Sequence, residues 1–469
     1  MNRIVLRVTL VLLGGVILNS CFQNNEDILD GSITSLRVSR DTVFFDTLLS
    51  DVQSPTRGFT IYNPHERAVE ISRIFLGMGS ASDYNLTVNG EAGKSFNNEV
   101  IFGGDSMLVL IDLVISPDDL DTTYASNDSV IFEFNGTQRD VKLRSWGQDH
   151  ISPPTDTIKS NVTWNAVRPY YLTKNVYVDS GYTLTIAAGT RIFIDPWDSI
   201  KVAGKLNIEG ELGNEVIITS SRGDQAYRHL SGQWGAIMFL PNSRGNINYA
   251  IISNAVNGIK VGFEAFENNC VVNISNTIIK NIQINGIQSF VSEMNAYNTV
   301  VNNCGTYLLA CLGGNYSFVN CTFTNAPNAF RGQNEPSVAF SDNWEFGRFA
   351  VNWPLDLVMY NSIIWGEQRE ELFVGDQTTA TQRVFLRNNL IRTLDQSYAI
   401  GDANIISQEI NYPRFYDVLD QDFRLDTLSN VVDKGIKIDS IQFDILGQER
   451  DDFPDLGAYE IADSLKAMN

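Results

Sequence analysis

The sequence predicts an all-β protein in which a β-sandwich is followed by a long parallel β-solenoid. Three features point to this fold class. With 35 Gly, 11% aromatic and only 19% charged residues, the composition of the 469-residue chain suits strands joined by many turns. Residues 36–149 alternate short apolar runs with turn residues. Residues 249–393 contain a motif that repeats along the chain.

Composition and charge exclude several classes of protein and partner. A hydrophobic fraction of 43% with a mean hydropathy of -0.10 excludes a disordered chain and a protein with many membrane spans. The chain has 34 basic and 55 acidic residues, a formal charge of -21. Nucleic acid and anionic bilayer surfaces would repel such a chain, so we expect neither as a partner.

Residues 1–20 have the features of a secretory signal peptide. Arg3 and Arg7 precede an apolar run, residues 8–18, that is too short to span a bilayer. The following Leu18-Asn19-Ser20-Cys21 resembles the lipobox of bacterial lipoproteins, which implies acylation of Cys21 and a lipid anchor; the alternative is ordinary cleavage beside an incidental Cys. Losing the two arginines leaves 32 basic against 55 acidic residues, a charge of -23.

Residues 21–35 are expected to form a tether. Its Glu26-Asp27 pair resembles the signal that carries lipoproteins of Bacteroidota to the cell surface. The resemblance implies an outer-membrane protein that faces the cell exterior. The alternative is a plain acidic tether, with the protein facing the periplasm.

Residues 36–149 suit an immunoglobulin-like β-sandwich, because about 110 residues of short strands are punctuated by turns such as Asn89-Gly90. The Tyr62-Asn63-Pro64 strand end and the Gly103-Gly104-Asp105-Ser106 turn resemble immunoglobulin-like domains of the abnormal-spindle/Hydin type, which implies a spacer or adhesion module. Pro153-Pro154 then predicts a linker over residues 150–160, since prolines interrupt strand pairing.

The repeated motif is a short apolar strand bounded by Asn. Its copies begin 27, 22, 22, 41 and 27 residues apart, as expected for five or six stacked coils of which one carries an insertion. Asn tolerates the left-handed bends between strands and forms ladders, so we interpret these residues as structural. We expect Ile251, Ile278, Val300 and Phe323 to form one interior column. The copies are Tyr249–Asn254, Asn276–Asn281, Asn298–Asn303, Asn320–Asn325, Asn361–Gly366 and Asn388–Thr393.

Two further segments carry a family resemblance. Leu184-Thr-Ile-Ala-Ala-Gly-Thr190 and Gln233-Trp234-Gly235 resemble the first coils of right-handed parallel β-helix proteins of the pectate-lyase-like superfamily. Asp444-Ile-Leu-Gly447 and Pro454–Glu460 resemble the segment that closes many β-helix proteins of Bacteroidota. The resemblance implies a right-handed parallel β-helix (solenoid) over residues 161–411 and a C-terminal capping segment over 412–469.

Both ends of such an array need caps that protect the strand edges. We assign residues 164–169 to the entrance cap and 412–460 to the exit cap, in which we expect Arg450 to pair with Asp455 or Glu460.

The titratable residues match no known catalytic or metal-binding motif. The three His are scattered, so we expect no metal and no cofactor. Four Cys could pair, although buried free thiols are favoured. The lyase-like bases and acids of the array fit a solvated charged face better than an active site, and we assign no catalytic residue. These groups are His65, His150 and His229; Cys270, Cys304, Cys311 and Cys321; and Lys260, Glu264, Glu267, Arg331 and Arg369.

Two sets of surface residues are candidate sites. The insertion over 331–357 carries aromatics that could stack on a sugar, contact a partner, or fold onto their own coil: Trp344, Phe346, Phe349 and Trp353. Ten Asp-Ser/Thr sites followed by an apolar residue or Thr resemble the O-glycosylation sequon of Bacteroidota, although this pair also suits ordinary turns. They lie at Thr42, Thr47, Ser106, Thr122, Ser129, Thr157, Ser199, Thr427, Ser440 and Ser464.

The whole chain resembles outer-membrane lipoproteins of Bacteroidota. This implies a non-catalytic, surface-exposed binding or scaffold subunit of an outer-membrane complex. Its partner would be an outer-membrane β-barrel or another lipoprotein, for example in β-barrel assembly, lipoprotein export or nutrient uptake. The alternative is a carbohydrate-active β-helix protein that binds a glycan or cleaves it as a polysaccharide lyase.

Overall fold

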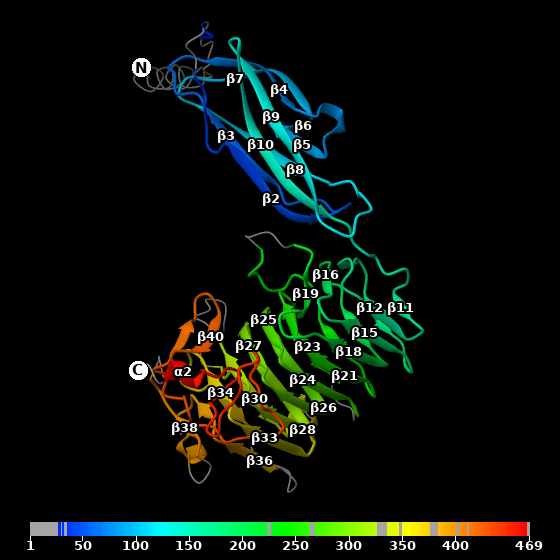
Figure 1. The fold of residues 1–469 in the computed structure, drawn as a ribbon, viewed down its shortest axis with the longest axis vertical. Helices are drawn as coiled ribbons and strands as arrows, with labels where there is room; N and C mark the ends of the chain where they lie inside the picture. The colour runs from blue at the N-terminus through cyan, green and yellow to red at the C-terminus, as the bar shows by residue number, and fades with distance from the viewer. Residues whose placement is uncertain are drawn as a thin grey trace, which may run out of the picture. The chain divides into compact units, whose positions relative to one another are not determined.

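The computed structural model describes residues 27–29, 31, 35–222, 227–262, 268–325, 335–346, 349–375, 383–399, 403–409 and 412–466. The chain divides into two compact units, residues 1–148 and 149–469 (Figure 1). Nearly all regular structure in these ranges is strand, which confirms the all-β class. Within them, no helix is long and apolar enough to cross a membrane.

The first unit is a sandwich of two five-stranded sheets. This unit also contains the short 3-10 helix η1 (Gly79–Ala81). Alternate residues of both sheets, such as Phe45 and Val109, point inward and form one buried core. One sheet has the order β1 (Arg37–Val38), β3 (Arg57–Tyr62), β8 (Ser106–Leu113), β5 (Tyr84–Val88) and β6 (Glu91–Gly93). The other has the order β2 (Thr42–Leu49), β10 (Thr137–Gln148), β9 (Tyr124–Phe134), β4 (Val69–Leu76) and β7 (Ser95–Ile101).

Part of the expected tether is attached to this sandwich. The Leu29 N–H donates to the Ala68 carbonyl at 2.7 Å, and the Asn135 amide donates to the Leu29 carbonyl at 2.8 Å. Within the tether predicted over residues 21–35, Leu29 therefore forms backbone hydrogen bonds with the sandwich and packs against its core.

The second unit is a parallel solenoid whose coils each contribute strands to three faces (Figure 1). The first face contains β11 (Thr157–Ile158), β14 (Val176–Val178), β17 (Ile200–Val202), β20 (Ile237–Phe239), β23 (Ile259–Val261), β30 (Val338–Ser341) and β35 (Leu372–Val374). The second contains β12 (Val162–Trp164), β15 (Thr183–Ala187), β18 (Lys205–Glu209), β21 (Arg244–Asn248), β24 (Val271–Ser275), β33 (Leu355–Tyr360) and β36 (Arg383–Arg387). The third contains β13 (Tyr170–Leu172), β16 (Arg191–Ile194), β19 (Val216–Ser220), β22 (Ala250–Ser253), β25 (Ile278–Ile282), β27 (Val300–Cys304), β29 (Thr322–Thr324), β34 (Ile363–Trp365), β37 (Leu390–Ile391) and β38 (Ile405–Ile406).

Two long strands join the first and second faces. β26 (Asn285–Tyr297) and β28 (Tyr307–Val319) run through both, so the two faces form one 16-stranded sheet. The strands bend where Val291 and Gly313 have φ of 44° and 53°. Parallel pairing in constant register stacks equivalent residues from coil to coil, which confirms the predicted parallel solenoid.

The corner between the second and third faces explains the repeated Asn. Tyr249 opens a column of positive-φ residues that continues with Asn at the start of every later repeat: Asn276, Asn298, Asn320, Asn361 and Asn388. Along this column the Asn298 amide donates to the Asn276 carboxamide oxygen at 3.0 Å. These Asn residues thus have the structural role that we predicted.

The predicted interior column is wrong by one residue in three of its four positions. Ile252, Ile279, Val301 and Phe323 stack in register and are fully buried. Their neighbours Ile251, Ile278, Val300 and Thr322 form the adjacent, outward column. A shift of one residue reverses the face of every strand residue, and the motif could not reveal the shift because both columns are largely apolar.

Residues 412–466, named here the C-terminal strap, explain why the outward column is apolar. The strap contains β39 (Phe415–Asp417), β40 (Asp422–Leu425) and the short helix α2 (Asp463–Lys466). Its apolar residues pack on the outside of the third face, for example Phe423 and Ile445 with Val300. The segment expected to cap the exit of the array therefore covers its side.

The ends of the solenoid are closed by other residues. At the exit, Tyr398 of η2 (Gln396–Ala399) packs against the solenoid core. In the first coil, Trp164 at the end of β12 stacks on Tyr170 of β13 with ring centroids 4.5 Å apart, and both belong to the solenoid core.

Part of the linker predicted over residues 150–160 pairs with strands of the solenoid. Ile151 bridges to Tyr170, and β11 pairs with β14. The Pro153-Pro154 dipeptide lies between these two paired positions. It therefore interrupts pairing only locally, within the first coil.

A buried ionic cluster holds the strap together. Arg450 lies 3.0 Å from Glu460, which confirms the predicted pairing, and it also donates to the Asn298 carboxamide oxygen at 3.0 Å. Lys466 lies 3.3 Å from Glu460 and 3.4 Å from Asp455. Burial raises the pKa values of the Asp455 and Glu460 carboxyls.

Candidate functional site

The outer surface of the first face contains a hollow of about 560 Å³, named here the flank hollow. Its floor is one outward column of the sheet, in which Gln288, Ala310, Ala339 and Phe373 pair in register on β26, β28, β30 and β35. The depth comes from the two alanines, because consecutive strands present single methyl groups between the longer Gln288 and Phe373 side chains. Three strand spacings separate these two residues, roughly 14 Å.

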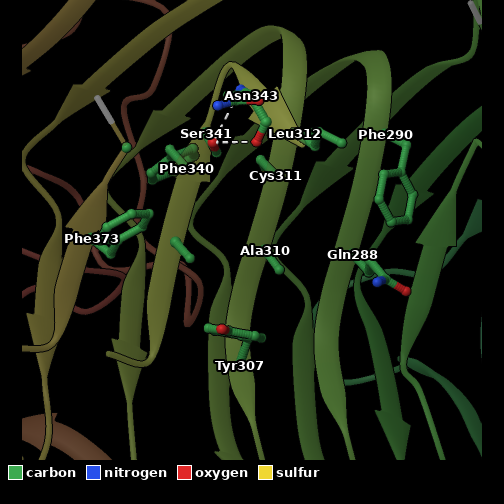
Figure 2. A pocket seen from close by; sticks show the side chains of 12 residues that line it. Gln288, Phe290, Tyr307, Ala310, Cys311, Leu312, Phe340, Ser341, Asn343 and Phe373 are labelled. Carbon is green, nitrogen blue, oxygen red and sulfur yellow. Dashed lines mark hydrogen bonds between the residues drawn. The ribbon is translucent and has the colours of Figure 1, made fainter. Parts of the chain in front are cut away.

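Aromatic and polar side chains surround this floor (Figure 2). Phe290 lies at one end of the hollow and Phe373 at the other, with Tyr307 along one side. Ser341 and Asn343 lie on the opposite side. The Ser341 hydroxyl donates to the Asn343 carbonyl at 2.7 Å and accepts from the Asn343 N–H at 3.1 Å, which fixes this wall. The hollow therefore combines flat apolar ends with hydrogen-bonding sides.

Asn343 also has, at the wall, a buried polar atom without a partner in the described part of the chain. Its carboxamide oxygen is buried and has no hydrogen-bond partner within the described residues. A buried acceptor without a partner costs free energy, which a donor from a ligand or a water molecule would recover.

The electrostatics of the flank hollow suit an uncharged occupant. Among its twelve described lining residues there is no Asp, Glu, Lys, Arg or His. Burial raises the pKa of the Cys311 thiol well above its usual range, so this group stays protonated at neutral pH. The flank hollow therefore offers an occupant dispersion contacts, ring stacking and hydrogen bonds to uncharged groups.

The four predicted aromatics belong to an insertion beside this hollow. Trp344, Phe346 and Phe349 lie on the hairpin of β31 (Asn343–Phe346) and β32 (Phe349–Asn352), and their side chains lie outside the described part of the structure. Trp353 is half-buried, and its N–H donates to the Asp342 carbonyl at 2.8 Å. The structure thus places the hairpin next to the flank hollow through Asn343, which belongs to both.

The structure does not bring together the lyase-like acids and bases that lie in its described part. Lys260 occupies the same outward column as Gln288, one strand away. Arg369 is exposed in the turn after β34 of the third face. Glu264, Glu267 and Arg331 lie outside the described residues. Among those residues, no three His, Cys, Asp or Glu side chains lie close enough to hold a metal ion.

The four cysteines of the solenoid are buried free thiols, as favoured from the sequence: Cys270, Cys304, Cys311 and Cys321. Cys21, the predicted lipidation site, lies outside the described residues.

The ten possible O-glycosylation sites differ in accessibility. Ser199 is only 6% exposed, and its hydroxyl accepts a hydrogen bond from the Ala236 N–H at 3.2 Å, so the prediction is wrong for Ser199 in the folded chain. Five sites are exposed: Thr47, Ser106, Thr122, Ser440 and Ser464. Four are half-buried: Thr42, Ser129, Thr157 and Thr427.

Sequence reasoning missed the residues that form the flank hollow. Gln288, Phe290, Ala310, Ala339 and Phe373 belong to no motif, because they come from four different coils. The spacing of the coils could have indicated the position of this hollow. Once the register is known, Ala310 and Ala339 become adjacent small outward residues with longer side chains on either side.

Comparisons with known proteins agree with the solenoid. Residues 156–269 match the family described as "Pectate-lyase like beta helix domain". Over these residues, about a quarter of its length, the chain is similar to that family. Among solved structures, pectate lyase Pel9A is 12% identical, with 67% of this chain and 88% of that chain covered and a TM-score of 0.25.

Two other structural likenesses are confined to about a quarter of the chain. A PapD-like domain of human CEP192 is 12% identical over 25% of this chain and 85% of that one, with a TM-score of 0.17. A family 123 glycoside hydrolase from Clostridium perfringens is 9% identical over 24% of each chain, with a TM-score of 0.18. We found no match among curated proteins. At these scores the structural likenesses carry no argument about function.

Proposed function

We propose that this protein is a non-catalytic, lipid-anchored binding subunit of the outer membrane in a member of the Bacteroidota. In this proposal Cys21 carries the lipid, and an immunoglobulin-like spacer presents a right-handed β-helix to the cell exterior. The flank hollow binds a β-barrel protein or another lipoprotein of the same complex. The O-glycosylation sites are those that the fold leaves accessible, with Ser199 excluded.

The observation that carries the proposal is the lining of the flank hollow. Aromatic ends, an alanine floor and amide or hydroxyl sides provide contact area and hydrogen bonds without charge. Aromatic anchors in partly enclosed sites dominate binding energy in protein interfaces. The described lining has no Asp, Glu, His or Lys that could act as general acid or base, and the Cys311 thiol stays protonated, so the lining supports binding more than bond cleavage.

A pull-down from detergent-solubilised outer membrane of the native host tests this proposal. We expect a stoichiometric partner with the wild-type chain and its loss with Ala310→Phe, which fills the floor of the hollow. Met238→Phe is the matched control, because Met238 lies in the same outward column two strands before Gln288. A chain recovered alone would overturn the proposal, and a partner retained by Ala310→Phe would place the contact elsewhere.

An uncharged glycan is the second candidate occupant, favoured by the separation of Phe290 and Phe373 at opposite ends of the hollow. Sugar rings stack on aromatic faces, and Gln288, Ser341 and Asn343 could bond to hydroxyls. Binding of neutral oligosaccharides by the purified chain, lost in Phe373→Ala, would promote this candidate above the protein partner.

A polysaccharide lyase is the remaining alternative. Such an enzyme needs a base beside a cation that stabilises an enolate-like intermediate. We expect no ultraviolet-absorbing unsaturated product from pectate, alginate or glycosaminoglycans, with or without Ca²⁺. Product formation that disappears in Lys260→Ala would overturn the non-catalytic proposal.

Location has its own test. We expect Cys21→Ala to abolish outer-membrane retention, and protease treatment of intact cells to cleave the wild-type chain. Normal processing and retention of the variant would contradict lipidation at Cys21. A chain that the protease never reaches would place it on the periplasmic side.

A further inference from the structure

A second hollow, of about 590 Å³, lies between the C-terminal strap and the corner that joins the third face to the first. We name it the corner hollow. One side consists of the ends of β29 and β34, with Asn325 and Trp365, and the other consists of strap residues that include Phe415 and Asp426. It shares no lining residue with the flank hollow.

The corner hollow contains a buried hydrogen-bond donor without a partner. Asn325 is 5% exposed, and its carboxamide oxygen accepts from the Cys304 N–H at 2.9 Å. Its Nδ2 group has no hydrogen-bond partner among the described residues. In an earlier coil the corner Asn donates to the Asn of the coil before it, as Asn303 does to Asn281 at 2.5 Å, whereas Asn325 Nδ2 makes no such bond to Asn303, its counterpart in the preceding coil.

The apolar wall of the corner hollow is held in place. Trp365 is 4% exposed, and its ring lies 5.1 Å from the Arg392 guanidinium carbon and 6.2 Å from the Tyr412 ring. Phe415 and Val418 face it from the strap. A preorganised apolar wall of this kind suits a methyl group or one face of a sugar ring.

The remaining lining groups are charged. Glu367 and Asp426 contribute two carboxylates, against the single guanidinium of Arg414. Because the site carries a net negative charge within a chain of charge -21, an anionic ligand is disfavoured. Carboxylates are strong acceptors for the hydroxyl groups of a neutral ligand.

From these three features we infer that the corner hollow binds a neutral 2-acetamido sugar. The acetamido carbonyl accepts from Asn325 Nδ2, its methyl group packs against Trp365 and Phe415, and the ring hydroxyls donate to Glu367 and Asp426. This inference is independent of the proposed function, because it concerns a different hollow and a different ligand.

Titration of the full-length mature chain with N-acetyl-D-glucosamine, followed by saturation-transfer NMR, tests the inference. We expect Asn325→Asp to weaken binding about tenfold, because the new oxygen keeps the bond from the Cys304 N–H but faces the sugar carbonyl with an acceptor. Glu367→Gln, at an exposed position, is expected to weaken binding several-fold without affecting folding. Glu209→Gln, at an exposed position that lines neither hollow, is the matched control and should bind as the wild type does.

Two related probes distinguish acetamido recognition from other chemistry. Glucose lacks the acetamido group, and glucosamine replaces it by a cation. Equal binding of glucose would overturn the role of Asn325, and equal or tighter binding of glucosamine would indicate recognition of an amine by the two carboxylates instead. No binding of any probe would overturn the inference and leave a water molecule as the partner of Asn325.

Discussion

Two outer surfaces of the same solenoid present apolar side chains, but only one of them is covered. On the third face, Ile278, Val300 and Ile363 point outward and lie beneath the strap. On the first face, Phe373 points outward with 49% of its surface exposed, at the end of the flank hollow. An apolar outward column of this solenoid is therefore part of the packed interior where the strap covers it. Where no described segment covers it, the column is a candidate binding surface.

Both the strap and the flank hollow contain buried polar groups. Under the strap, Arg450 donates to Glu460, Asn298 and the Gly457 carbonyl, all at 3.0 Å. In the flank hollow the Asn343 carboxamide oxygen has no such partner among the described residues. The Nε atom of Arg450 also has no partner among the described residues, so an unpartnered buried atom does not by itself distinguish the two surfaces.

The largest expected loss of stability comes from a substitution in the interior column, compared with the same substitution in the outward column beneath the strap. Ile279→Asp would bury an unpaired carboxylate in the solenoid core and should lower the free energy of unfolding by roughly 5 kcal/mol or more. Ile278 is half-buried under the strap, so Ile278→Asp should lower the free energy of unfolding by only about 2 kcal/mol. Chemical denaturation of both variants gives the comparison; equal losses would contradict the register found here.

Removing the cation at the centre of the strap should have the next largest effect. Arg450→Met leaves Glu460 and its neighbouring carboxyls without a buried partner, so we expect a loss of about 3–5 kcal/mol. Limited proteolysis should then cut within residues 412–466 before the solenoid. The double variant Arg450→Met/Glu460→Leu should recover much of this loss. If the single variant is as stable as the wild type, the cluster does not hold the strap.

Stability should also fall as pH rises. Burial and repulsion from Asp455 raise the pKa of Glu460 to about 7, from an ordinary value of 4.5. Between these values the folded chain binds more protons than the unfolded chain, so the contribution of Glu460 to stability is full below about pH 4.5 and falls by about 2 kcal/mol between pH 5 and pH 8. Thermal unfolding across this range measures the slope, and Glu460→Gln should flatten it. A rise in stability from pH 5 to 8 would contradict the sign.

The smallest effect on stability is expected on the first face, at Phe373 of the flank hollow. Phe373→Ala removes a half-exposed ring from the flank hollow and should change stability by less than about 0.5 kcal/mol. Val300→Ala, beneath the strap, is the matched comparison and should cost about 2 kcal/mol. Denaturation midpoints test this pair. A large loss for Phe373→Ala would show that the flank hollow is part of the packed structure and not a free surface.

Much of the fold was predictable because it depends on local or repeating chemistry. Asn at the start of each repeat marks left-handed corners that few other residues tolerate, so the coils could be counted from Asn276 onward. The pairing of Arg450 was also predictable, because a cation near Asp455 and Glu460 in a short apolar segment needs a partner. The backbone hydrogen bonds that Leu29 and Ile151 form within the predicted tether and linker were not predictable, because their partners are distant in sequence.

The sequence by itself determined the all-β class, the repeating coils and the structural role of the corner Asn residues. Each follows from residue type and spacing along the chain. Only the tertiary structure decided which apolar column faces the core, that the strap covers one side, and that Ala310 and Ala339 form the floor of a hollow. The physical reason is that two adjacent apolar residues look alike in a strand until their cover is known. A binding surface made from four coils has no sequence motif, because its residues become neighbours only when the coils stack.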